Sequence, residues 1–145
     1  MTNECVICNK HKNLKELTGE IICERGGLVL THFPDINNEQ ATKGHLILDP
    51  RRHITDLAEL NQAEAEALGV IVQKAVESVK LVCGAEHVYM FRINDLVAHL
   101  HIHLVPRYPD TPREFWGPKI MEWPGRLKIS LNEIFPISKL AINEF

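Results

Sequence analysis

The sequence contains no stretch of roughly 18 consecutive apolar residues, the length that a membrane-spanning helix requires. Its polar start leads directly into Cys5 and shows no signal peptide, so a cytoplasmic location is expected. An excess of cations is also missing, because the net charge is −3, and this argues against a nucleic-acid-binding surface. These absences predict a soluble protein, and they leave room for a small ligand bound by a few local groups.

Repeats, low-complexity tracts and flexible linkers are absent as well, and 145 residues fit one domain of ordinary size. Strands are predicted at 45–48, 86–93 and 99–105, and two more lie within 20–31 around a Gly26-Gly27 turn. A polar loop is expected at 33–43, and a last short element at 126–135. The predicted order of strands, one helix and more strands indicates an α+β domain with a largely antiparallel sheet.

The clearest helix is predicted at residues 61–83. Its apolar residues recur at helical spacing: Leu68, Ile71, Val72, Ala75, Val79 and Val82. Asn61 followed by Glu64 is typical of a helix start, and Gly84 of a helix end.

Cysteine is scarce, with four residues, and only Cys5 and Cys8 form a C-x-x-C pair. A lone pair of this kind is compatible with a redox pair, with plain thiols, or with a zinc site completed by two other ligands. Cys23 and Cys83 fall at positions that predict burial, on a strand and at a helix end.

Histidine, by contrast, is abundant, and three of the eight residues fall at 99, 101 and 103. In a strand these three side chains would share one face, with Leu100, Ile102 and Leu104 on the other. Three interpretations compete: an exposed strand with chance histidines, a metal site, or nucleophilic catalysis in which one imidazole attacks and its neighbours position it.

The run from His99 to Val105, continued by Pro106-Arg107, resembles the signature of the histidine triad (HIT) family. A second block, residues 43–48 followed by Pro50-Arg51-Arg52-His53, resembles another stretch of that family at the right separation. The resemblance covers roughly residues 5–108. It implies a five-stranded antiparallel sheet with helices, and a homodimer that extends this sheet through the long helix and a strand.

The resemblance also implies roles for individual residues. His101 would attack the α-phosphorus of a nucleotide, His103 would hydrogen-bond the phosphate, and His45 would line the site. Asp35 would bind the ribose hydroxyls, and Asn94 would contact phosphate. The base pocket would be formed by Val6, Ile7, Phe33 and Ile36, for which plain core packing is the alternative.

Some bacterial members of the family also resemble this chain at its C-x-x-C pair. They imply a structural zinc ion held by Cys5, Cys8, His53 and His99. The HIT domain is then expected to cover residues 1–125, with residues 126–145 as a C-terminal extension packed on it or on a dimer partner.

The resemblance predicts a nucleotide hydrolase or transferase. It would act at the α-phosphate of nucleoside phosphoramidates or dinucleoside polyphosphates through a nucleotidyl-histidine intermediate. Two alternatives stay open: a nucleotide-binding or scaffolding protein with little catalysis, and a metal-dependent hydrolase with the three histidines as ligands.

Overall fold

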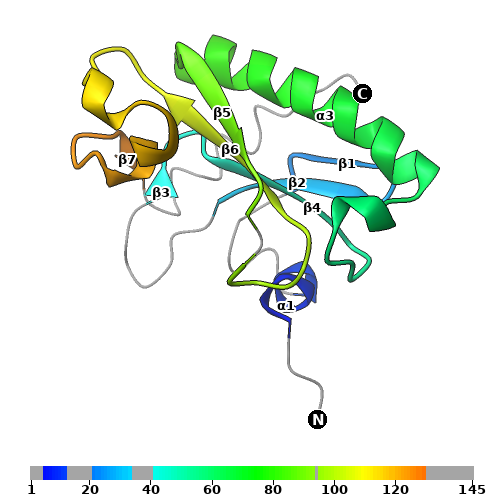
Figure 1. Ribbon diagram of the computed structural model, residues 1–145. Coiled ribbons are helices and arrows are strands. Elements are labelled where there is room, and N and C mark those ends of the chain that lie inside the picture. Colours follow the sequence, from blue (N-terminus) through cyan, green and yellow to red (C-terminus); the bar gives the residue numbers. More distant parts are fainter. Residues whose placement is uncertain (1–4, 13–20, 34–40, 94, 130–145) are drawn as a thin grey trace.

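A five-stranded antiparallel sheet organises the chain (Figure 1). The computed structural model describes residues 5–12, 21–33, 41–93 and 95–129. In sheet order the strands are β1 (Cys23–Arg25), β2 (Leu28–His32), β4 (Leu46–Pro50), β6 (Ile102–Arg107) and β5 (His87–Phe91). A separate two-stranded sheet joins β3 (Ala41–Thr42) to β7 (Lys128–Ile129). The predicted α+β class and the five-stranded antiparallel sheet are confirmed.

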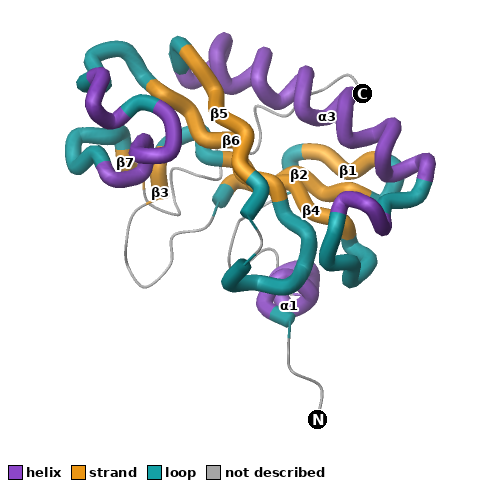
Figure 2. The backbone as a smooth tube through the Cα atoms, viewed as in Figure 1, coloured by secondary structure: helices purple, strands orange, loops and turns teal. Residues whose placement is uncertain are grey.

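Two helices lie on opposite sides of the sheet: α1 (Val6–Lys12) and the long α3 (Gln62–Ser78). Helix α3 continues into a π-helical turn, Val79–Cys83. Short 3₁₀ turns occupy Leu57–Glu59, Arg113–Phe115 and Gly117–Glu122. Figure 2 shows how loops connect these elements. Within the described residues, no helix has the length and apolar character needed to cross a membrane.

The start and end of α3 follow from its sequence. Asn61 Oδ1 accepts a hydrogen bond from the Glu64 amide at 2.9 Å, and the Glu64 carboxylate accepts one from the Asn61 amide at 2.9 Å. This reciprocal cap satisfies two amides that the first helical turn leaves unpaired. At the other end Gly84 adopts a φ of 80°, a left-handed conformation that glycine tolerates best.

The β1–β2 hairpin turns at Gly26 and Gly27, as predicted. Their φ values are 58° and 90°, which suit the tight turns of two-residue hairpins. Gly26 is also required for space, because a Cβ there would lie 2.7 Å from the carbonyl oxygen of Ala63 on α3.

One face of the sheet packs on α3 and forms the main core. Leu46 and Leu48 of β4, with Ile102 and Leu104 of β6, belong to this core together with Ile71 of α3. Because side chains alternate along a strand, the intervening residues of β4 and β6 point to the opposite face. That second face carries the polar residues of the candidate site, and α1 lies beside it (Figure 1).

Candidate functional site

Strand β6 begins at Ile102, three residues later than the sequence predicts. The preceding residues are held by other contacts, since Leu100 N–H donates to the Ile54 carbonyl at 2.7 Å and the His99 ring contacts the Pro50 carbonyl. The prediction that His99, His101 and His103 all belong to one strand is therefore wrong, because His99 and His101 precede β6.

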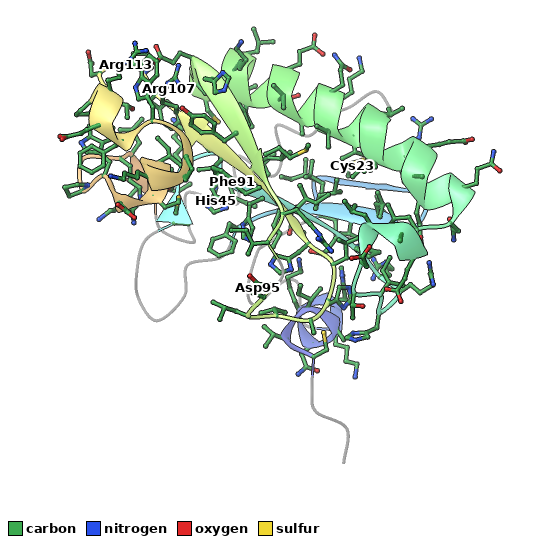
Figure 3. All side chains as sticks on the ribbon, viewed as in Figure 1. Cys23, His45, Phe91, Asp95, Arg107 and Arg113 are labelled. Carbon is green, nitrogen blue, oxygen red and sulfur yellow. The ribbon has the colours of Figure 1, made fainter. Side chains whose placement is uncertain are left out.

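His101 and His103 do lie together, with ring centroids 5.2 Å apart. His45, just before β4, joins them through a 2.9 Å contact between its Nε2 and His103 Nδ1. Phe33 stacks on His45 with ring centroids 4.4 Å apart and an angle of 8° between the planes. Figure 3 labels His45 and Phe91, and Phe91 is the β5 residue that pairs with His103. The structure thus brings His45, His101, His103 and Phe33 together.

The His101 ring is oriented by a main-chain carbonyl. Its Nδ1 lies 2.7 Å from the carbonyl oxygen of His99, which can only accept a hydrogen bond. The proton of a neutral His101 must therefore sit on Nδ1, which leaves its Nε2 unprotonated. This is the form that attacks an electrophile. The sequence indicates no partner for this ring, because the partner is backbone.

His45 and His103 are both held neutral. Burial, followed by the neighbouring His103, lowers the pKa of His45 well below 6.5, and burial with His101 lowers the pKa of His103 to about 4. His45 Nδ1 is buried without a hydrogen-bond partner in the described part of the chain, and an unpaired buried N–H would be costly. We therefore place the His45 proton on Nε2, from which it is donated to His103 Nδ1. His103 then offers its Nε2–H as a donor beside His101.

His99 turns its ring away from this pair and toward the cysteines. Its Nδ1 lies 3.3 Å from Cys5 Sγ, 3.5 Å from Cys8 Sγ and 3.2 Å from His53 Nδ1. Cys8 Sγ is also 3.6 Å from His53 Nδ1. The four ligand atoms all lie within 4.8 Å of one another, so they form a cluster that can hold a metal ion.

The geometry of this cluster fits a tetrahedral ion. With metal–sulfur bonds of about 2.3 Å and metal–nitrogen bonds of about 2.0–2.1 Å, ligand atoms lie about 3.3–3.8 Å apart. The distances above match this range within about 0.1 Å. His99 Nε2 is 2.7 Å from the Pro50 carbonyl, the second-sphere contact that directs the other ring nitrogen to a metal. Burial, and then the Cys5 thiol, raises the pKa of Cys8, a cost that a bound cation would offset.

Neither His101 nor His103 belongs to a metal-capable group within the described residues. The second such group is His11, Asp49 and His99. The alternative in which all three triad histidines ligate one catalytic ion therefore gains no support from the geometry.

The predicted nucleotide contacts are only partly described. Asp35, Ile36 and Asn94 lie outside the described residues, so their roles stay predictions. On α1, Val6 is exposed and Ile7 is buried, and their role in a base pocket stays a prediction. Phe33 contacts the site directly, through His45 and, at 5.3 Å between ring centroids, His103.

Sequence reasoning missed two groups near the site. His32 is fully buried, contacting the Phe33 carbonyl through Nδ1 and accepting from Gly44 N–H at Nε2. Lys10, His11 and Asp49 form a buried charged cluster between α1 and β4. The one available signal was Asp49, an acidic residue inside the otherwise apolar run 46–50.

Comparison with known proteins agrees with this geometry. A family model described as the HIT domain matches residues 28–110, and the chain belongs to this family. AP-4-A phosphorylase of Mycobacterium tuberculosis is 30% identical over 95 residues, which make up 61% of this chain and 47% of that protein. The chain therefore spans about half the length of the curated relatives it matches.

Solved structures share the fold at low sequence identity. A HIT-like protein involved in cell-cycle regulation from Bartonella henselae has a TM-score of 0.65 at 18% identity, over 97% of this chain and 95% of its own. A zinc-bound histidine triad family protein from Mycobacterium smegmatis has a TM-score of 0.64 at 19% identity, over 96% of this chain and 93% of its own.

Proposed function

We infer that the protein is a nucleotide hydrolase or transferase that uses His101 as a nucleophile on an α-phosphorus. One observation carries this proposal: the His99 carbonyl holds the His101 proton on Nδ1, while the His103 ring lies 5.2 Å away. An unprotonated ring nitrogen beside an N–H donor supplies the nucleophile and the charge stabilisation that displacement at phosphorus uses.

The reaction divides into two displacements. His101 Nε2 forms a bond to phosphorus, the leaving group departs with the electron pair of its own bond to phosphorus, and the imidazole becomes a cation. Water then forms the new phosphorus–oxygen bond, and the pair of the nitrogen–phosphorus bond returns to His101. The proton lost by water ends on the leaving group. His103 donates from Nε2 to a phosphate oxygen in both steps, and His45 keeps that donor in place.

The family and the relative support a choice of substrate class. We propose nucleoside phosphoramidates or dinucleoside polyphosphates, because the similar Mycobacterium tuberculosis protein is described as an AP-4-A phosphorylase. Phe33, already stacked on His45, would bound the base pocket, with Val6, Ile7 and Ile36 as further candidates. Asp35 would bind the ribose hydroxyls.

The cluster of Cys5, Cys8, His53 and His99 is proposed to hold a structural zinc ion. Zinc accepts two thiolates and two imidazoles in tetrahedral geometry, which the ligand spacing here supports. When bound, the ion would fix the His99 ring, whose own carbonyl orients His101.

A substrate panel tests the function. Nucleoside phosphoramidates and dinucleoside polyphosphates are incubated with the protein, with and without inorganic phosphate, and the products are identified by mass spectrometry. We expect a nucleoside monophosphate, or a diphosphate where phosphate replaces water. Nucleotide binding without turnover across the panel would favour the scaffolding alternative. Turnover that disappears when a second, weakly held metal ion is removed would favour the metal-dependent hydrolase.

A further inference from the structure

A buried charge cluster, consisting of Lys10, His11 and Asp49, joins α1 to β4. The Lys10 ammonium contacts Asp49 Oδ2, and His11 Nε2 lies 2.5 Å from Asp49 Oδ1. Side-chain exposure is 6% for Lys10, 7% for His11 and 0% for Asp49. Both oxygens of this carboxylate are therefore directed at α1, away from solvent.

The buried charge cluster lies on the same sheet face as the histidines. In the β4–β6 register Ile47 pairs with His103 and Leu48 with Ile102, the last pair of this ladder. Asp49 follows Leu48 on β4, and His101 directly precedes Ile102. Leu48 belongs to the core under α3, and Asp49, one residue on, points to the opposite face. The His11 ring also lies 6.4 Å from the His99 ring.

Folding stability alone does not explain why charged side chains are buried between α1 and β4. A buried ion pair is often no better for stability than two apolar side chains of similar volume, because both ions lose their hydration. Helix α1 already buries Ile7 nearby, so an apolar contact is available to it. A metal ion on Asp49 and His11 is disfavoured too, because the Lys10 ammonium contacts the same carboxylate.

The proposed reaction, on which this inference rests, gives these charges a use. His101 changes from a neutral ring to a cation when its Nε2 bonds phosphorus, and His103 must stay neutral beside it. We propose that Asp49 is a positioning residue for the reaction: it fixes Lys10 and His11 of α1 against the triad, and its fixed negative charge favours the cation that forms on His101. A preorganised charge acts here without solvent rearrangement. The pKa of His103 reflects the cluster too, since after burial and His101 it is lowered by Lys10 and raised by Asp49.

A paired substitution separates an effect of these charges on the reaction from an effect on folding stability. The double variant Lys10→Met/Asp49→Leu replaces the ion pair by apolar side chains. We expect its melting temperature and metal content to stay close to wild type, its kcat to fall at least tenfold, and its KM to change less than threefold. When the protein is mixed with a labelled nucleotide, the rate at which label first appears on His101 should fall together with kcat. Asp49→Glu, which keeps the charge, should retain kcat within about threefold.

The control is another ion pair from the same end of β4. Arg51 and Glu24 are paired at 2.5 Å but are 43% and 41% exposed, and Arg51→Met/Glu24→Leu should leave kcat and labelling unchanged. If the apolar double variant does not fold, Lys10→Met/Asp49→Asn replaces it with the same expectations.

Three results would contradict the proposal. A folded double variant with wild-type kcat and labelling would show that the buried charge cluster is only structural. A loss of metal in step with activity would assign the cluster to the metal site instead. A wild-type protein without turnover would contradict the proposed function and this inference together, whereas the first two results leave the proposed function intact.

Discussion

His32 illustrates how a buried imidazole is kept neutral by its neighbours. Its Nδ1–H donates to the Phe33 carbonyl at 2.8 Å, and its Nε2 accepts from Gly44 N–H at 2.9 Å. A proton on Nε2 would remove that acceptor and place a charge in the protein interior. Burial accordingly lowers the pKa of His32 to about 4.

This pairing predicts an acid-sensitive fold. Between pH 6.5 and 4 the unfolded chain binds a proton at His32 that the folded chain does not, so the free energy of unfolding falls as the pH falls through this window. One such group contributes a slope of about 1.4 kcal/mol per pH unit. His32→Gln, which cannot titrate, should show a shallower slope in urea unfolding between pH 7 and 5. Equal slopes in the two proteins would mean that His32 is protonated in the fold.

At the scale of elements, α1 depends on contacts outside itself. A helix of seven residues is too short to persist alone in water. Its anchors are Cys5 and Cys8, which belong to the cluster that can hold a metal ion, and Lys10, which contacts Asp49. Removing the metal should therefore release α1 from the histidine face.

Chelation measures this dependence. We expect one zinc ion per chain by elemental analysis, and a melting temperature that drops by at least about 4 °C in chelator, because losing 1–2 kcal/mol has an effect of that size in a chain of this length. Cys8→Ser should lack zinc and not respond to chelator. Cys83→Ser, outside the cluster, should keep its zinc and its response to chelator. Metal-free wild-type protein with unaltered melting would refute the structural role.

The elements also show which features were accessible from sequence. Capping residues and the glycine turn are local signals, so the sequence predicted the extent of α3 with its π-helical turn and the position of the β1–β2 hairpin turn. The metal cluster followed from family resemblance rather than from spacing, since Cys8 and His99 are 91 residues apart. The late start of β6 and the partner of His101 depend on main-chain hydrogen bonds, which leave no mark on residue identity. The Lys10–Asp49 pair likewise needs the fold to bring it together.

At the scale of the whole molecule, one sheet edge and one helix end expose apolar surface. Strand β5 is last in the sheet order, and its Met90 is 60% exposed. Leu81 and Val82, after α3, are 83% and 42% exposed. Leu68 and Ile71 of α3, the helix through which the resemblance implies dimerisation, pack in the chain's own core instead. An unpaired edge beside apolar residues is a natural pairing surface.

A homodimer through this surface is the expected assembly. Light scattering at micromolar concentration should give twice the chain mass of 16.5 kDa. Met90→Lys combined with Leu81→Glu should shift the mass toward the monomer, because charges would be buried in the interface. Leu127→Glu, at a 50% exposed position elsewhere, should remain dimeric. A monomeric wild type would contradict this assembly.

The covalent role of His101 is the central claim, and rapid quenching with a labelled nucleotide tests it most directly. Label should appear on His101 within the first turnover and be recovered by peptide mapping under alkaline conditions, which preserve phosphohistidine. His101→Ala should bind nucleotide within a few-fold of wild type but lose label and nearly all turnover. Label on another residue, or full activity in His101→Ala, would contradict the account.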